Sequence, residues 1–275
     1  MAYEILGKGA LNYQPCRYGA SKILFRGPKK KLADPFIAVL GGTETYGKFL
    51  EHPFPDLLQH ESGIQAVNFG CPNAGVDAFL HDHGLLTISH KAAVTVLQVP
   101  GAHNMSNRFY AVHPRRNDRF LRASNALKEL YCEIDFTEFN FTRHLLGVLH
   151  ETSPDRFANI VEELRIAWVA RMKLLIANLD SSIILLWLAD HPISEGGRLG
   201  VDGTDPLFVD RHMIEEVSPF VRDVVEVSIS EEEREQGRDA LVFADMDAPA
   251  TREMLGTVAH RKASRALRNV VERLI

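Results

Sequence analysis

The sequence predicts an α/β protein, a flavodoxin-like three-layer α/β/α sandwich built on a parallel sheet of about five strands. Its short apolar runs are rich in β-branched residues and lack polar alternation, which is typical of strands buried on both faces of a parallel sheet. Helical stretches lie between these runs, and strands that alternate with helices indicate βαβ units. The chain has 275 residues, 45% of them hydrophobic and 24% charged. This composition suits a single globular domain over residues 1–275.

Each strand corresponds to one apolar run. We predict strands at residues 36–40, 64–69, 92–99 and 182–188, and a fifth at either 221–229 or 241–243. Helices are predicted at 48–60, where Pro53 and Pro55 interrupt the pattern, and at 76–91, 155–179 and 260–275. The helix at 155–179 is the longest, because apolar side chains recur there at three- and four-residue steps after a start signal at Ser153-Pro154-Asp155.

Three segments lie outside this alternation. Residues 1–35 are predicted to form an N-terminal arm packed on the domain, and residues 191–206 a surface loop. Residues 100–154 form an unusually long connection between the third and fourth strands. A connection of this length is functional or carries its own secondary structure. We therefore expect a helical cap insertion over the carboxyl edge of the sheet.

Charge and hydropathy restrict the partners. The net charge of −5 and the pI near 6.2 give no field that would attract nucleic acid or an anionic membrane. The longest apolar run, 183–189, is far shorter than the roughly 20 residues of a transmembrane helix. The first residues lack the pattern of a secretion signal. We expect a cytoplasmic protein that binds neither nucleic acid nor membrane.

Metal and disulfide chemistry are not expected. Cys16, Cys71 and Cys132 are far apart, and no CxxC pair occurs. His81 and His83 could ligate a metal only from an extended segment, with no further ligands nearby in the sequence. We therefore predict neither a metal site nor a cofactor.

The strongest candidate site is Gly41-Gly42-Thr43-Glu44-Thr45, directly after the first strand. Ligands in open α/β sheets bind beyond the carboxyl ends of the strands. Glycines there allow a sharp turn and leave backbone amides free to hold an anion. A hydroxyl at Thr43 would lie at the start of a helix, which suits a nucleophile or an oxyanion donor. The alternative is a plain strand-to-helix turn with Thr43 as the N-cap.

Four blocks in order resemble the SGNH, or GDSL, hydrolase superfamily. In that superfamily a first strand leads into Gly-Asp-Ser-x-Thr, the second into a turn with Asn and Gly, the third into Gly-x-Asn-Asp, and Asp-x-x-His precedes the last helix. The corresponding segments here are Gly41–Thr45, Asn68–Gly75, Gly101–Asn104 and Thr257–His260. With the first strand and the last helix included, they span residues 36–275, and the resemblance lies in their order because each block alone is weak.

The resemblance implies an esterase or acyltransferase acting on a small-molecule or glycan ester, such as an O-acetyl group of a glycan. Thr43 would then be the nucleophile and His260 the general base. The oxyanion donors would be the Thr43 amide, the turn from Asn73 to Gly75, and Asn104.

The blocks depart from the superfamily pattern at three positions. Thr43 replaces the nucleophilic serine, Gly42 the aspartate beside it, and Thr257 the aspartate that orients the histidine. The missing carboxylate could come from Glu44, Asp210 or Asp245. His212 is a rival to His260, because Asp210 precedes it closely, although a surface helix start explains that segment as well.

Four residues are candidates for contacting a substrate: Glu44, His103, Arg115 and Arg116. Glu44 and His103 lie within the predicted site region. The arginines belong to a basic cluster at 108–122, which could grip an anion bidentately. Pairing of the cluster with Asp118, Glu129 or Asp135 would explain it equally well.

Two other functions fit the same segments. One is a non-catalytic protein that binds an anion or a glycan in the same pocket. The other is a P-loop nucleotide-binding protein, because Gly42 to Lys48 fits the G-x-x-x-x-G-K pattern. Phe49, however, stands where a P-loop has a Ser or Thr for Mg²⁺.

Overall fold

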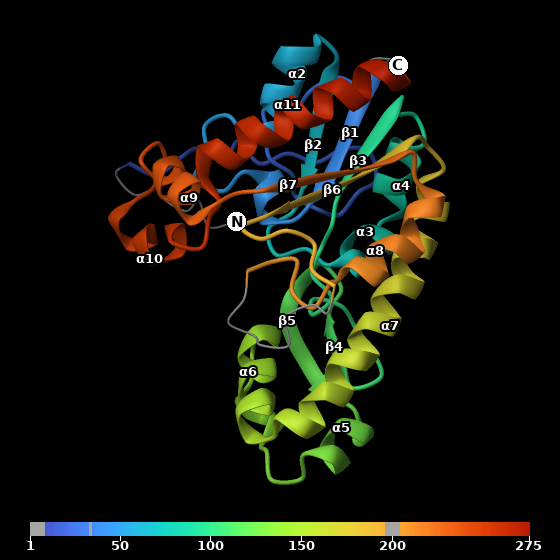
Figure 1. The fold of residues 1–275 in the computed structure, drawn as a ribbon, viewed down its shortest axis with the longest axis vertical. Helices are drawn as coiled ribbons and strands as arrows, with labels where there is room; N and C mark the ends of the chain where they lie inside the picture. The colour runs from blue at the N-terminus through green and yellow to red at the C-terminus, as the bar shows by residue number, and fades with distance from the viewer. Residues whose placement is uncertain (1–8, 33–34, 196–203) are drawn as a thin grey trace.

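One parallel sheet organises the molecule. The structure is a computed structural model that describes residues 9–32, 35–195 and 204–275. Its five-stranded sheet has the order β2-β1-β3-β6-β7, with every neighbouring pair parallel. The strands are β1 (Phe36–Gly41), β2 (Gln65–Gly70), β3 (Val94–Gln98), β6 (Ile183–Ala189) and β7 (Asp223–Ser228). Helices cover both faces, as Figure 1 shows, which confirms the predicted α/β/α sandwich with five parallel strands.

Both faces of the sheet are buried, which explains the continuous apolar runs. On β1, Ile37 and Val39 pack into one cluster while Ala38 and Leu40 pack into the other. The first cluster lies under α2 (Phe54–Ser62) and α11 (Gly256–Leu274). The second lies under α3 (Val76–Leu80), α4 (His83–Ser89) and the long α7 (Pro154–Leu179).

The predicted elements differ from the observed ones mainly at their ends. The fifth strand is the one within 221–229, and residues 241–243 belong to no strand. The helix expected from residue 48 begins only at Phe54, because Pro53 is its N-cap and Pro55 lies in its first turn. The helix expected at 76–91 is two helices, since the Asp82 carboxylate caps the start of α4 by accepting the Leu85 N–H.

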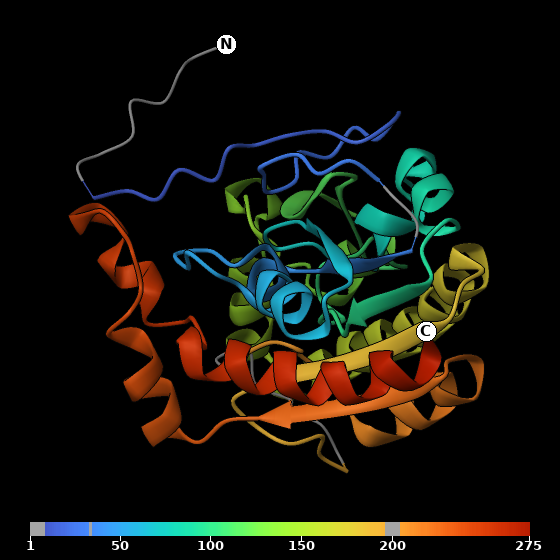
Figure 2. The same cartoon turned by 90° about the horizontal axis from the view of Figure 1, so that it is seen from above.

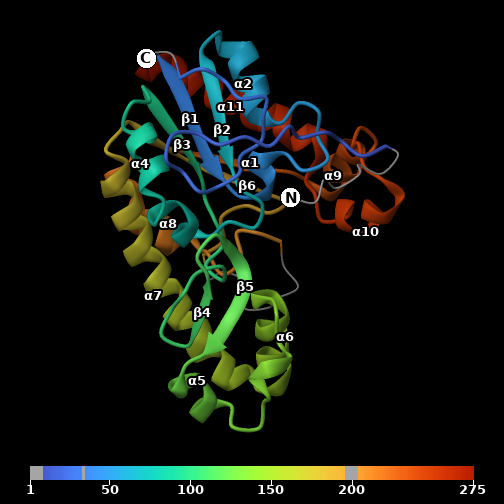
Figure 3. The same ribbon diagram turned by 180° about the vertical axis from the view of Figure 1, so that it is seen from behind.

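The insertion at 100–154 is not only helical. It begins with an antiparallel hairpin of β4 (Tyr110–His113) and β5 (Arg116–Ala123). It continues with α5 (Asn125–Leu130), a 3-10 turn (Phe136–Glu138) and α6 (Thr142–Thr152). We call β4, β5, α5 and α6 the lobe. Figures 1 and 3 show the lobe beyond one end of the sheet, with α7 running from it along the sheet.

The remaining helices are short. They are α1 (Thr43–Tyr46), α8 (Arg211–Val217), α9 (Glu231–Arg238) and α10 (Ala248–Thr251). Two further 3-10 turns span Ser218–Phe220 and Asp245–Asp247. Of the loop predicted at 191–206, residues 196–203 lie outside the described residues. Within the described part of the chain, no helix combines the length and the apolar character needed to cross a membrane.

The N-terminal arm is fixed to the domain by a buried arginine. Figure 2 shows residues 9–32 running along one side of the molecule; residues 1–8 and 33–34 lie outside the described residues. Arg26 is 8% exposed, and its guanidinium donates to four backbone carbonyls. These belong to Tyr46 (3.3 Å), Gly47 (2.6 Å), Leu50 (2.6 Å) and Glu51 (2.8 Å). Arg26 thus holds the chain that follows α1.

Replacing this arginine tests the attachment of the arm. We expect Arg26→Met to lower the free energy of unfolding by about 2 kcal/mol or more, because it leaves buried carbonyls without donors. Arg17→Met is the matched control, since Arg17 is an exposed arginine of the same arm. Urea denaturation of both variants measures the difference. Equal stabilities would show that the four hydrogen bonds contribute nothing.

Candidate functional site

A buried polar contact fixes the start of α1 against the ends of β2 and β3. The Gln98 Oε1 accepts from both the Thr45 N–H (3.1 Å) and the Thr45 hydroxyl (2.6 Å). Asn68 Nδ2 donates to the Thr45 carbonyl at 2.7 Å. A Cβ at Gly41 would lie 2.1 Å from the Thr45 Oγ, so only glycine leaves space for this contact. Thr43, two residues before Thr45, is therefore held at the carboxyl edge of the sheet.

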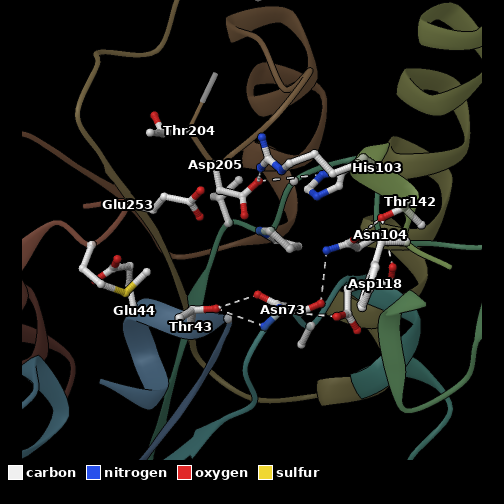
Figure 4. Close-up of a pocket in the computed structure, with 18 of the residues that line it drawn as sticks. Thr43, Glu44, Asn73, His103, Asn104, Asp118, Thr142, Thr204, Asp205 and Glu253 are labelled. Atoms are coloured by element: carbon white, nitrogen blue, oxygen red, sulfur yellow. Dashed lines mark hydrogen bonds and ion pairs between the residues drawn. The ribbon is translucent and has the colours of Figure 1, made fainter. Parts of the chain in front are cut away.

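Thr43, Asn73 and Asn104 form a hydrogen-bonded row across three strand ends. The Thr43 hydroxyl donates to Asn73 Oδ1 at 3.1 Å and accepts the Asn73 N–H at 3.0 Å. Asn104 Nδ2 donates to the Asn73 carbonyl at 3.2 Å, while its Oδ1 accepts from the Thr142 hydroxyl at 2.7 Å. Figure 4 shows the row. The N-cap of α1 is Gly42, so the alternative role of Thr43 as N-cap does not apply.

Gly75 does not have the role expected of it. Its N–H donates to Asn117 Oδ1 at 3.0 Å and so is not free to stabilise an oxyanion. A Cβ at this position would lie 1.6 Å from the Asn104 carbonyl oxygen. The absence of a side chain at Gly75 therefore allows the loops after β2 and β3 to approach each other. This approach places Asn73 beside Asn104.

His260 is also placed differently from the expectation. It is 0% exposed, and its Nδ1 accepts the Phe54 N–H at 3.0 Å. Its Nε2 therefore carries the proton and lies 2.9 Å from Glu44 Oε2. Neither nitrogen is left to take a proton from Thr43, which corrects the general-base assignment. The other Glu44 oxygen accepts the Leu255 N–H at 3.2 Å, so the pair ties α1 to the start of α11.

The rival residues lie elsewhere. His212 is on the surface of α8, with its side chain 77% exposed. Asp210 caps α8 through the Met213 N–H, and Asp245 begins a 3-10 turn. Of the three carboxylates considered as partners for His260, Glu44 is the one in contact with it.

A cavity of about 890 Å³ opens at the carboxyl edge beside Thr43 (Figure 4). Five predicted residues line it: Thr43, Glu44, Asn73, His103 and Asn104. Arg115 and Arg116 are not among its lining residues, because they lie exposed at the turn between β4 and β5. Sequence reasoning missed the other polar and charged side chains of the wall, which include Asp118, Thr142, Arg143, His144, Glu151, Thr204, Asp205, Arg234 and Glu253.

His103 is a buried imidazole with an unsatisfied nitrogen. It is 3% exposed, and its Nδ1 has no hydrogen-bond partner among the described residues. The nearest Asp205 oxygen lies 3.7 Å away, too far for a hydrogen bond. Burial lowers the pKa of His103 to about 4, and the Asp205 carboxylate opposes this shift only in part. At neutral pH the ring is uncharged, and a polar ligand could satisfy its free nitrogen.

The P-loop alternative does not fit the backbone. Thr43 to Tyr46 form one helical turn, which Gly47 ends with a left-handed φ of 73°. Lys48 follows this turn, and its Nζ lies 4.7 Å from the centroid of the Phe49 ring. In a P-loop the glycine-rich segment is an open loop, and the lysine stands at the start of the next helix.

His103 predicts an acid-sensitive stability. Because its folded-state pKa of about 4 lies below the usual 6.5, the unfolded chain binds more protons between these values. The free energy of unfolding therefore has its full value above pH 6.5. It falls by up to about 3 kcal/mol as the pH drops towards 4. We expect His103→Gln to remove this part of the pH dependence. Chemical denaturation across this range measures it, with His212→Gln as the exposed control; superimposable profiles for all three proteins would contradict the prediction.

Comparison with known proteins places the chain in a family. No curated protein matches it. Three solved structures are similar at low identity, and one is a lipase from a goat rumen metagenome, which is 11% identical with a TM-score of 0.38 over 84% of this chain and 97% of the lipase. A gut microbial diltiazem-metabolizing enzyme is 9% identical with a TM-score of 0.41, over 90% of this chain and 48% of that enzyme. A protein described as a GDSL-like lipase from Parabacteroides merdae is 13% identical with a TM-score of 0.40, over 90% of this chain and 100% of that protein. A family model matches residues 1–275, and the chain therefore belongs to the family described as Domain of unknown function (DUF6473).

Proposed function

We propose that the chain cleaves or transfers the acyl group of an ester, with the Thr43 hydroxyl as nucleophile. The observation that carries the proposal is the hydrogen-bonded row of Thr43, Asn73 and Asn104 at three strand ends. The blocks that contribute these residues have the order seen in the SGNH superfamily, which they resemble. A hydroxyl beside an oriented amide, at the mouth of a polar cavity, has the parts that acyl transfer requires.

Two donors are available for the oxyanion. The Thr43 N–H belongs to the first turn of α1, where backbone N–H groups have no acceptor within the helix. Asn104 is 5% exposed, and the Thr142 hydroxyl fixes its amide so that Nδ2 points towards Asn73 and the cavity. Preorganised donors of this kind stabilise charge that develops on a carbonyl oxygen during attack.

We assign to Glu253 the role of general base, which His260 cannot fill. Its carboxylate has no hydrogen bond or ion pair within the described residues, and Figure 4 shows it pointing into the cavity. In the proposed reaction, Thr43 Oγ attacks the ester carbonyl carbon and its proton passes to Glu253. The bond to the alcohol then breaks, and the leaving oxygen takes that proton. Water or a second alcohol finally removes the acyl group from Thr43.

The arrangement predicts slow chemistry. In the free protein the Thr43 hydroxyl donates to an amide oxygen, which cannot accept its proton. The side chain has to turn before it can attack, and its methyl group crowds the reacting oxygen. The cavity wall carries both acidic and basic side chains, which suits a polar small molecule or a glycan ester better than a long aliphatic one.

A threonine series tests the nucleophile. We expect Thr43→Ser to raise kcat for p-nitrophenyl acetate, because the methyl group is lost while the hydroxyl stays. Thr43→Ala should abolish turnover, and Asn104→Ala should lower kcat by roughly 10²–10³ as one oxyanion donor disappears. Thr87→Ala is the control, since Thr87 is exposed on α4.

Two results would contradict the proposal. Wild-type activity that survives Thr43→Ala would place the reaction elsewhere. Silence of wild type, Thr43→Ser and Thr43→Ala on a panel of esters would favour the ligand-binding alternative on the same cavity.

A further inference from the structure

A second, smaller cavity adjoins Thr43. It has a volume of about 360 Å³, and it shares Thr43, Asn73, Glu253 and Met254 with the larger cavity. Both volumes fall within the roughly 300–1,000 Å³ of small-molecule sites. The proposed nucleophile therefore stands where two compartments meet. An ester bound across this junction would have its acyl group in one compartment and its alcohol in the other.

Asn104 indicates which half of the ester occupies which compartment. It lines the larger cavity and is absent from the lining of the smaller one. With the carbonyl oxygen directed at this amide, we assign the acyl group to the larger cavity. The smaller cavity is left for the alcohol.

Two tyrosines line the smaller cavity. Tyr13 comes from the N-terminal arm and Tyr46 from α1, with ring centroids 5.2 Å apart. The Tyr13 hydroxyl accepts the Phe49 N–H at 2.8 Å, which fixes this ring, and Arg26 holds the Tyr46 carbonyl. The arm thus builds part of the compartment. Pro72, Ala250 and Met254 add further apolar surface.

The rest of the lining is polar. Lys48 can donate hydrogen bonds, Glu253 can accept them, and Asn73 can do both. A saturated ring with an apolar face and hydroxyl groups around its edge would satisfy both parts of the lining. A plain aryl ring would satisfy only the tyrosines.

We propose that the smaller cavity is the subsite for the alcohol half of the substrate and that it binds a pyranose ring against Tyr13 and Tyr46. This proposal rests on the proposed function, because it takes Thr43 as the reacting group. It also assigns the N-terminal arm a part in substrate recognition.

The test compares one acyl group on three alcohols. The substrates are methyl glucopyranoside monoacetate, ethyl acetate and phenyl acetate, and the proteins are wild type, Tyr46→Phe, Tyr46→Ala and the control Phe220→Ala. Phe220 is an aromatic residue that is 58% exposed and lines neither cavity. We expect Tyr46→Ala to lower kcat/KM for the pyranoside ester about tenfold through KM, as the loss of one aromatic contact predicts. Tyr46→Phe, which keeps the ring, should lower it less than Tyr46→Ala does. The loss caused by Tyr46→Ala should be larger for the pyranoside ester than for ethyl acetate. Phe220→Ala should stay within about twofold of wild type on all three substrates.

A binding measurement separates the two proposals. Saturation-transfer NMR follows unacetylated methyl glucopyranoside on Thr43→Ala, with and without Tyr46→Ala. Binding that Tyr46→Ala removes supports the subsite even when no ester is cleaved, and then only the proposed function fails. Three results would overturn the subsite. The first is ester cleavage without preference for the pyranoside, and the second is a preference for phenyl acetate that depends on Tyr46. The third is pyranoside binding that Tyr46→Ala leaves unchanged. The absence of both binding and cleavage would overturn it as well.

Discussion

The contact between Thr45, Gln98 and Asn68 is the constraint on which the rest of the site depends. It joins the start of α1 to the last residues of β2 and β3, and its members are 0%, 6% and 6% exposed. Polar groups buried to this degree are costly unless they are paired, so the three segments hold one another in a single arrangement. From that arrangement follow the direction of the Thr43 hydroxyl and its distance from Asn73. The sheet brings the carboxyl ends of the strands together, and this contact orients the side chains that follow them.

Both ends of the chain support the same short helix. Arg26 reaches from the N-terminal arm to the carbonyls that follow α1, and Tyr13 adds a ring to the wall beside it. From the other end, His260 on α11 contacts Glu44 within α1. The four residues of α1 pack against β1 and β2, and these distant segments add further contacts. His260 therefore has a positioning role that its location in the last helix does not reveal.

The sequence allowed the sheet to be predicted because strands buried on both faces must be continuously apolar. Thr43, Asn73 and Asn104 were expected together because of the resemblance to the SGNH superfamily, and the fold brings them together because the carboxyl ends of parallel strands meet at one edge. The hairpin was missed because β5, with Arg116, Asp118, Arg119 and Arg122, carries too many charges to read as a strand. The environment of His260 was missed because its partner Phe54 is 206 residues away. Glu253 belongs to no motif, and only the folded chain brings it to the cavity.

The 26 residues of α7 make it about 39 Å long, and it is shared by the lobe and the sheet. It begins beside α6 and ends at the turn before β6, packing on α3, α4 and α8 along the way. A continuous helix that is packed against other elements at both ends is not expected to bend as a hinge. We therefore expect the lobe, which carries Asp118, Thr142, Arg143 and His144 to the cavity, to keep its position relative to the sheet when a ligand binds.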